Sequence, residues 1–154
     1  MNIKNKLFQS FVVATIAGLS LTAFAQQQDP ALGTWKTIDD KTGQPLYLIK
    51  IDVNQGVADG TITKVFPIAG EPLLVTCTLC KDERKDQPIV GMKLMTGLKA
   101  DKPGYWSGGK ILDPKDGNTY TVKMSTDDGK KMDVRGYIGI PLLGRTQEWF
   151  KVEQ

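Results

Sequence analysis

The chain reads TYTVKMSTDDGKKMDVRGYIG from Thr119 to Gly139, and this stretch decides the fold. Apolar residues or glycine occupy every second position from Tyr120 to Met124 and again from Met132 to Ile138. Alternation with a period of two is typical of β-strands that bury one face. Between the two runs, Asp127-Asp128-Gly129 supplies the residue types that tight turns prefer. The stretch therefore predicts a β-hairpin.

Working outward, turn-forming Gly, Asn, Asp and Pro divide the rest of the chain into similar short runs. We expect about nine strands, at Gly33–Ile38, Leu46–Val53, Val57–Phe66, Leu73–Thr76, Ile89–Met95, Tyr105–Leu112, Thr119–Ser125, Lys131–Gly139 and Thr146–Val152. Strands with one apolar face must stack as two sheets or close on themselves, and closure removes exposed edges. The sequence thus predicts an all-β fold, a small antiparallel up-and-down β-barrel of about 8–10 strands, with a two-sheet sandwich as the alternative.

The first 25 residues have the three-part layout of a secretory signal peptide. Lys4 and Lys6 precede an apolar stretch that ends in Ala23-Phe24-Ala25, the small-x-small pattern that signal peptidase reads. Polar residues interrupt this stretch, which disfavours a transmembrane anchor. We expect cleavage near Ala25-Gln26, a loose tail over 26–30, a single domain over 31–154 without a transmembrane segment, and a periplasmic or secreted location.

The composition excludes several classes of function. The chain contains no histidine, which rules out Ser-His-Asp and Cys-His catalysis in their usual forms and histidine-ligated zinc. Loss of Lys4 and Lys6 leaves 18 basic residues against 17 acidic ones in residues 26–154, so nothing predicts a nucleic-acid partner. We expect no cofactor, no metal site and no catalytic residue.

Six segments in order along the chain carry a family resemblance. They are Gly33-x-Trp35, Cys77-x-x-Cys80, Pro88-Ile89-x-Gly91, Trp106-x-Gly108-Gly109-x-Ile111-x-Asp113-Pro114-x-x-Gly117-x-x-Tyr120, Val134-Arg135-Gly136-Tyr137-x-Gly139 and Leu143-Gly144-Arg145-Thr146-x-x-Trp149. Over about residues 31–152 the chain resembles the bacterial family called domain of unknown function 2147. The resemblance implies an exported protein with a lipocalin-like barrel, and it implies no activity.

A second feature is similar to lipocalin-like barrels, which carry Gly-x-Trp on the first strand and Arg on the last. Trp35 and Arg145 occupy matching places. The resemblance implies that the Arg145 guanidinium stacks on the Trp35 indole and closes one end of the barrel, as a structural cation–π contact. The alternative is that Trp35 is ordinary core and Arg145 an ordinary surface charge.

Cys77 and Cys80 are the two cysteines, and their spacing fits three interpretations. In an oxidising compartment, neighbouring thiols form a structural disulfide, which is the interpretation that we favour. Cys-x-x-Cys is also the spacing of thiol–disulfide exchange. Half of a zinc site is the third interpretation, but no further cysteine or histidine exists to complete it.

The sequence supports three hypotheses on function. The first is a non-enzymatic binding protein that holds a small or partly apolar ligand in or at the mouth of the barrel. Its candidate ligand-binding residues are Tyr47, Tyr105, Trp106, Tyr120, Arg135 and Tyr137. The second is a thiol-active envelope protein that uses Cys77 and Cys80. The third is a protein–protein interaction module whose contact surface is the charged run 81–86.

Overall fold

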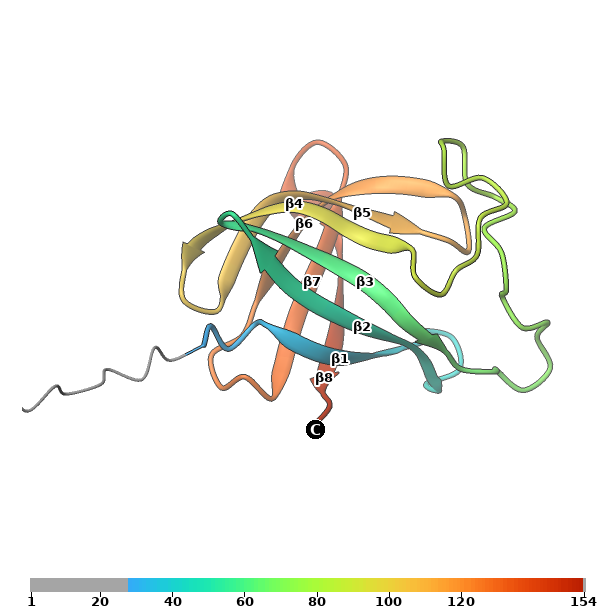
Figure 1. Ribbon diagram of the computed structural model, residues 1–154, viewed down its shortest axis with the longest axis horizontal. Coiled ribbons are helices and arrows are strands. Elements are labelled where there is room, and N and C mark those ends of the chain that lie inside the picture. Colours follow the sequence, from blue (N-terminus) through green and yellow to red (C-terminus); the bar gives the residue numbers. More distant parts are fainter. Residues whose placement is uncertain (1–27, 154) are drawn as a thin grey trace, which may run out of the picture.

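Eight antiparallel strands follow one another along the chain, and each pairs with its neighbour in sequence until β8 pairs with β1 to close a barrel (Figure 1). The computed structural model describes residues 28–153. The strands are β1 (Gly33–Ile38), β2 (Pro45–Asn54), β3 (Val57–Val65), β4 (Lys93–Lys102), β5 (Tyr105–Asp113), β6 (Asn118–Ser125), β7 (Lys131–Tyr137) and β8 (Arg145–Lys151). The short 3-10 helix η1 (Pro141–Leu143) precedes β8.

The predicted fold class is confirmed, since the chain forms an all-β, up-and-down, closed barrel with a strand count inside the expected range. One expected strand, Leu73–Thr76, is absent as a strand. In its place, a long segment over 66–92 makes a single isolated bridge between Thr76 and Pro88. Closure of the barrel leaves no free strand edge for this segment, so its pairing is limited to this bridge and two flanking hydrogen bonds, from Ile89 N to Val75 O and from Cys77 N to Gln87 O.

The barrel interior is filled by the alternating residues of the strands. The fully buried side chains include Trp35, Ile49, Ile51, Ile62, Met95, Leu98, Val122, Met124, Met132 and Trp149. Gly109 shows how tight this packing is, because a Cβ at that position would lie 2.6 Å from Leu98 Cγ. The neighbouring Gly108, with φ +77, lies at the irregularity in the β5–β6 register, so the paired glycines mark a β-bulge.

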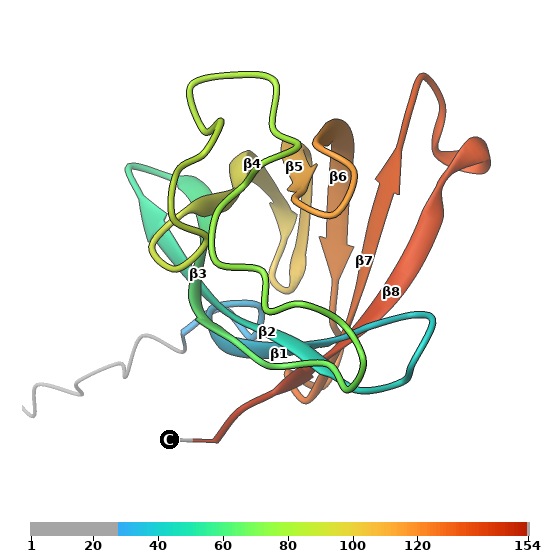
Figure 2. The same ribbon diagram turned by 90° about the vertical axis from the view of Figure 1, so that its right-hand side faces the viewer.

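The two ends of the barrel differ in their connections. At one end, here called the hairpin end, short turns join β2 to β3, β4 to β5 and β6 to β7. At the other end, here called the loop end, lie the connections 39–44, 66–92, 114–117 and 138–144. Figure 2 looks onto the loop end, where the long 66–92 segment runs in front of the strands. The three longest connections between strands, 39–44, 66–92 and 138–144, therefore all lie at the loop end.

The hairpin end is closed by Trp35. The indole Nε1 donates a hydrogen bond of 2.8 Å to Ala31 O, and Lys151 Nζ lies 4.6 Å from the ring centroid. Lys151 also donates to the carbonyl of Leu32. Asp29, expected in a loose tail, instead accepts hydrogen bonds from Gly104 N at the β4–β5 turn. Of the expected tail, 26–30, the structure describes residues 28–30. The expected signal peptide, 1–25, lies outside the described residues.

The cation on Trp35 corrects the expectation for Arg145. In the β1–β8 pair, Trp35 lies opposite Lys151, which is six residues from Arg145 along β8. At about 3.3 Å per residue, that separation places Arg145 about 20 Å away, at the loop end. Arg145 there pairs with Asp40 at 3.0 Å. The end plug was predicted with the right aromatic residue and the wrong cation, because position on the last strand alone does not fix the cross-strand register.

Candidate functional site

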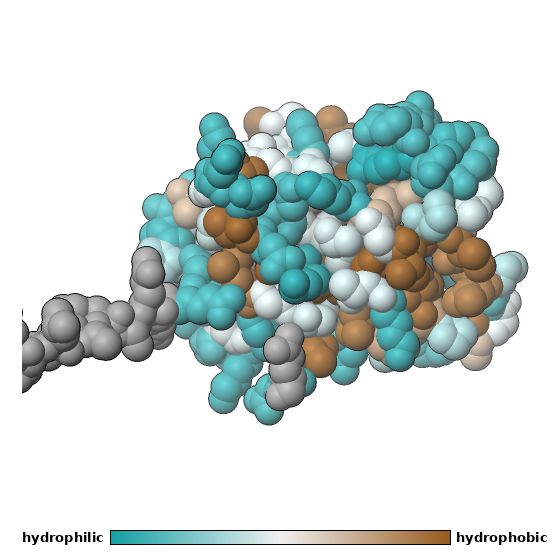
Figure 3. All heavy atoms as spheres, viewed as in Figure 1, coloured by the Kyte–Doolittle hydropathy of each residue, from teal (hydrophilic) through white to brown (hydrophobic). Residues whose placement is uncertain are grey.

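An apolar cavity of about 240 Å³ lies at the loop end of the barrel. Its apolar lining comes from the ends of β2 and β3, from the 66–92 segment and from the β5–β6 turn: Leu46, Val65, Phe66, Ile68, Leu74 and Leu79, with Pro72 and Pro114. Figure 3 shows hydrophobic residues gathered at this end of the molecule, below the hydrophilic tip of the 66–92 segment. The volume lies just below the range for ligand pockets of drug-sized molecules, which is about 300–1,000 Å³, so only a small ligand or part of one would fit.

Local contacts hold the first part of the cavity wall. Phe66 N donates to Leu46 O at 2.8 Å, which extends the β2–β3 ladder by one hydrogen bond and places Phe66 beside Leu46. Val65 lies opposite Tyr47 in the register, so these two side chains share a face of the sheet. The wall on this side is therefore a continuation of the barrel.

The opposite wall is held by the disulfide segment. Cys77 and Cys80 form a disulfide, the pairing that we expected from the sequence, and both residues are buried. Between them, the Leu79 backbone packs onto Gly117, where a Cβ would lie 1.7 Å from Leu79 O. Gly117 has φ +70, a conformation that glycine adopts without strain. The disulfide and this backbone contact together fix Leu79 at the edge of the cavity.

The burial of both cysteines also bears on the thiol-exchange hypothesis. Cys77 is 0% exposed and Cys80 is 2% exposed, whereas exchange requires an attacking thiolate to reach a disulfide sulfur. The burial of both cysteines is therefore typical of a structural disulfide.

A three-group ion network forms the polar edge of the cavity. Lys115 Nζ lies 2.8 Å from Asp39 Oδ2 and 3.1 Å from Glu71 Oε2. The hydrogen bond from Lys115, helped by bonds from Thr42, lowers the pKa of Asp39 to about 2 despite its burial. The same hydrogen bond, which Lys115 donates to Asp39, raises the pKa of Lys115. The network ties together three separate connections of the loop end, at 39–44, 66–92 and 114–117.

Next to this network lies a carboxylate with weaker compensation. Asp113 Oδ1 accepts a hydrogen bond from Lys115 N at 2.9 Å, while Oδ2 lies 3.9 Å from Arg145 Nη2. Burial raises the pKa of Asp113 above its ordinary value, and the charge of Asp116 adds to the effect. Arg145 itself is closer to Asp40, at 3.0 Å. Asp113 is thus a half-buried carboxylate whose cation is mainly engaged elsewhere.

Tyr47 is a buried tyrosine whose cross-strand neighbour, Val65, lines the cavity. Its side chain is 4% exposed, and its hydroxyl has no hydrogen-bond partner among the residues that the structure describes. Burial raises the pKa of the Tyr47 hydroxyl, and the negative charges of Asp113 and Asp39 raise it further. A buried polar group without a partner is uncommon in proteins and needs an explanation.

The six predicted ligand-binding residues do not form one site. Tyr47 and Tyr120 lie on the inner side of their strands, toward the loop end, and the Tyr120 hydroxyl donates to Asp116 Oδ2 at 2.7 Å. Tyr105 and Trp106 begin β5, at the hairpin end. The Tyr105 hydroxyl donates to Asp127 there, and Trp106 is buried.

The remaining two candidates belong to the outer face of β7. Arg135 and Tyr137 alternate with the buried Met132 and Val134. Arg135 holds the 138–144 loop, since its Nε donates to Pro141 O at 2.7 Å and its Nη1 donates to Thr146 Oγ1 at 2.7 Å. Arg135 therefore stabilises the 138–144 loop.

The aliphatic lining of the cavity was not predicted. The predicted ligand-binding residues are aromatic or charged, whereas half of the residues that line the cavity are Leu, Ile or Val. One feature of the sequence does point to this wall. The stretch from Phe66 to Val75 combines apolar residues with prolines and is far longer than a hairpin turn.

Exposed aliphatic side chains border the same end of the barrel. On the 138–144 loop these are Ile138, Ile140, Leu142 and Leu143, which are 55–81% exposed, and on the 66–92 segment they include Leu73, Val75, Leu79 and Val90. Single exposed apolar residues are normal in proteins, and of these eight residues only Leu79 lines the cavity. The apolar character of the loop end therefore extends beyond the cavity itself.

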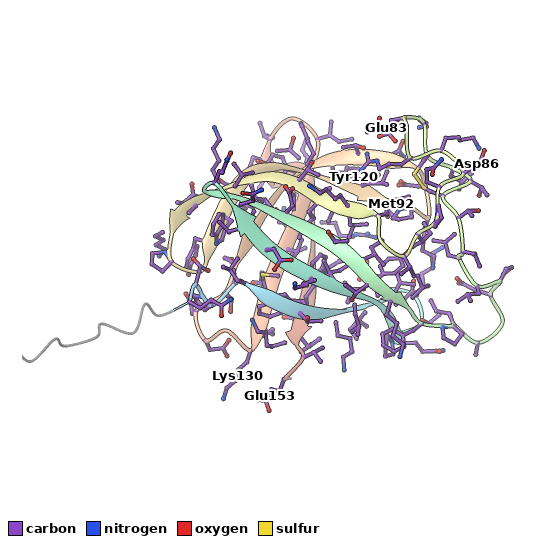
Figure 4. The ribbon with its side chains drawn as sticks, viewed as in Figure 1. Glu83, Asp86, Met92, Tyr120, Lys130 and Glu153 are labelled. Atoms are coloured by element: carbon purple, nitrogen blue, oxygen red, sulfur yellow. A yellow bond between two sulfur atoms is a disulfide. The ribbon has the colours of Figure 1, made fainter. Side chains whose placement is uncertain are left out.

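The charged run 81–86 is engaged mainly with its own neighbours. Arg84 Nε lies 3.1 Å from both oxygens of Asp82, and this contact lowers the pKa of Asp82 to about 2. Lys81 Nζ donates to Asn118 Oδ1 at 2.6 Å. Figure 4 places Glu83 and Asp86 at the outer tip of the segment, near the disulfide and far from Lys130 and Glu153. Ion pairs within the run engage Asp82 with Arg84 and Lys85 with Asp86, while Lys81 is bound to Asn118 of β6.

Comparison with known proteins supports the same fold. A family model described as "Uncharacterized protein conserved in bacteria (DUF2147)" matches residues 33–151. Among solved structures, a protein described as "Protein HP1028 from the human pathogen Helicobacter pylori belongs to the lipocalin family" has a TM-score of 0.68 and 15% identity, over 80% of this chain and 83% of that chain. No curated protein matches the sequence. Within residues 28–153, no helix is long and apolar enough to cross a membrane.

Proposed function

The chain belongs to the bacterial DUF2147 family, and from that premise we propose that it is an exported, non-enzymatic protein that binds a small, partly apolar ligand at the loop end of its barrel. The observation that carries the proposal is the apolar cavity of about 240 Å³ with a charged edge. Because the barrel interior is filled by side chains, a ligand enters at the mouth, where the connections form the walls.

The proposed location is the periplasm or the exterior of the cell. The signal-like layout of residues 1–25 and the buried disulfide support this location, since disulfides persist in oxidising compartments. The thiol-active alternative loses support from the burial of both cysteines.

The binding proposal is tested with N-phenyl-1-naphthylamine, a neutral dye that fluoresces in apolar surroundings. We expect saturable binding of one dye per chain. Leu79→Asp removes an apolar wall and adds a charge, and because Leu79 is 54% exposed the variant is expected to fold. Loss of about 1 kcal/mol of apolar contact corresponds to about a fivefold weaker affinity.

Val75→Asp is the matched control, since Val75 lies on the same segment, is 62% exposed, and is not part of the cavity lining. It should leave dye affinity within twofold of the unmodified protein. The proposal fails if the unmodified protein gives no saturable signal, or if the Leu79 and Val75 variants lose affinity equally.

A further inference from the structure

The connection between β7 and β8, residues 138–144, has the sequence IGIPLLG and contains no polar side chain. Its four aliphatic residues are 55–81% exposed: Ile138, Ile140, Leu142 and Leu143. The short helix η1, which forms part of it, has no buried residue. The connection projects beyond the ends of the neighbouring strands β5 and β6 (Figure 1, Figure 2). Contiguous exposed apolar side chains of this kind mark a surface that contacts a protein or a membrane.

The backbone of this connection is hydrogen-bonded within the protein. Arg135 Nε donates to Pro141 O at 2.7 Å, and Arg135 Nη2 donates to Leu142 O at 3.3 Å. Leu143 N donates to Ile140 O at 3.2 Å. Pro141 has no N–H group that needs a partner. Because an unbonded backbone group is costly to move from water into hydrocarbon, these bonds suit the connection to insertion among lipid tails.

Three cations lie on the outer face of the barrel next to the same connection. Lys123 of β6 lies directly opposite Arg135 of β7 in the register. Lys110 of β5 is in one row with Thr121 and Tyr137, so it lies two strands, about 10 Å, from Tyr137. Lys110 Nζ donates to Thr121 Oγ1 at 3.0 Å, as expected for side chains on one face. Within residues 28–153, these three cations form no ion pair.

The carboxylates of this region lie further away or are already paired. Asp133 and Glu148 lie opposite each other in the β7–β8 register, nearer to the hairpin end than the three cations. Asp40 pairs with Arg145 at 3.0 Å. The charged run 81–86, which also projects at the loop end, contains three basic and three acidic residues. The surface beside the connection is therefore positive and attracts an anionic partner.

We propose that residues 138–144 dock the protein on an anionic lipid bilayer, with the aliphatic side chains among the lipid tails and the three cations at the phosphate groups. An apolar surface that enters a bilayer by about 5–10 Å reaches the boundary between headgroups and acyl chains. Arg135 lies three residues before Ile138, which is about 10 Å of extended chain and places its charge at the level of the headgroups. Burial of apolar area and attraction to anionic lipids then act together.

A second copy of this chain fits the surface less well than a bilayer does. A symmetric dimer through this surface would bring Lys110, Lys123 and Arg135 of one copy toward the same three cations of the other, and like charges repel. A protein with an acidic groove would avoid this repulsion but would need a concave shape that matches the projecting connection. A bilayer has the required charge and needs no such shape.

The test is cosedimentation of the purified protein with two kinds of vesicle at low salt: phosphatidylcholine alone, and phosphatidylcholine with an equal amount of phosphatidylglycerol. We expect the affinity for the mixed vesicles to be at least about tenfold higher, and to fall when the salt is raised to about 0.5 M. Leu142→Asp should weaken binding to the mixed vesicles by at least about tenfold. Leu73→Asp is the matched control, since Leu73 is 53% exposed at the same end of the barrel and the change of charge is identical, and it should stay within about twofold.

A pair of double variants tests the cationic face. Lys110→Gln with Lys123→Gln should weaken binding to the mixed vesicles by about tenfold, because each lysine near an anionic surface contributes to attraction. Lys99→Gln with Lys130→Gln removes the same total charge from exposed positions toward the hairpin end and should have little effect. Equal losses in the two double variants would show a general attraction of charge and would overturn the inference.

Leu142→Trp reports on insertion directly, because the three native tryptophans are buried. On addition of the mixed vesicles, its emission should shift to shorter wavelength and should be quenched by lipids with brominated acyl chains. Leu73→Trp should show neither effect. Absence of binding to both kinds of vesicle would overturn the inference and would point to an acidic protein as the partner of this surface. Binding without quenching would also overturn it. The naphthylamine assay tests the cavity separately, so neither result decides the other.

Discussion

Asp39→Asn is the most direct perturbation of the network that shapes the loop end. Asp39 Oδ1 accepts hydrogen bonds from Thr42 N at 2.9 Å and from Lys41 N at 3.1 Å, and Oδ2 binds Lys115 Nζ at 2.8 Å. The amide oxygen of asparagine can keep the two backbone bonds. Its amino group, however, faces another donor in Lys115, so the substitution removes the charged contact and little else.

The magnitude follows from the pKa of Asp39, which hydrogen bonds from Lys115 and, to a smaller extent, from Thr42 lower from 3.8 to about 2. At about 1.36 kcal/mol for each pH unit, the folded state favours the carboxylate by about 2.4 kcal/mol. Because the folded pKa lies below the unfolded one, this stabilisation is fully present above pH 3.8. It is lost as the pH falls toward 2. We therefore expect the variant to be about 2 kcal/mol less stable at pH 6 and nearly equal in stability near pH 2.

Urea unfolding at pH 6 and at pH 2.5 measures this difference. With a urea dependence of about 1–3 kcal/mol per molar for a small domain, the midpoint at pH 6 should fall by about 1 M. Asp52→Asn is the matched control, because Asp52 is exposed and its pair with Lys50, at 3.3 Å, lies on the surface. That variant should change stability by less than about 0.5 kcal/mol. An Asp39 variant whose deficit is the same at both pH values would refute the reasoning, since the loss would then not come from the charge.

Two further predictions concern the backbone and the processing of the chain. Gly117→Ala should cost at least about 2 kcal/mol in thermal unfolding, because its φ is +70 and a Cβ would lie 1.7 Å from Leu79 O, whereas Gly43→Ala, with φ +68 and open space, should cost about 1 kcal/mol or less. Equal costs would show that the contact with Leu79 does not constrain the segment. The intact mass of the native protein from an envelope fraction, without reductant, should equal residues 26–154 less two hydrogens. A mass that includes residues 1–25, or free thiols, would remove the case for export.

The sequence predicts local features better than features that depend on register. The alternation in Thr119–Gly139 identifies a hairpin because period two is set within each strand. Trp35 was placed correctly at a barrel end, but its cation was not, because the stagger of β8 against β1 decides whether Lys151 or Arg145 is its neighbour. Side-chain chemistry alone does not encode that stagger.

The ligand-binding candidates failed for a related reason. The candidates share a residue type, but a barrel has two ends and each strand has an inner and an outer face. Only residues at the same end and on the same face can form one site. Tyr105 lies at the hairpin end and Arg135 lies on the outer face of β7, while Tyr47 lies toward the loop end. The cavity wall around Leu79 depends on a disulfide, a glycine contact and an ion network that join distant parts of the chain. No short sequence pattern records such contacts.

The close packing of the barrel interior leaves little room for substitutions that would enlarge it. Gly60 and Gly109 leave no room for even a Cβ, since one at Gly60 would lie 2.9 Å from Met95 Cε and one at Gly109 would lie 2.6 Å from Leu98 Cγ. Enlarging the interior would therefore remove core contacts and destabilise the barrel. The walls of the cavity come largely from residues 66–79 and 114–115, most of which contribute little to that core. Substitutions there can change the size and charge of the cavity at small cost to the fold, so under the proposed binding function we expect specificity to depend on the connections of the loop end rather than on the strands.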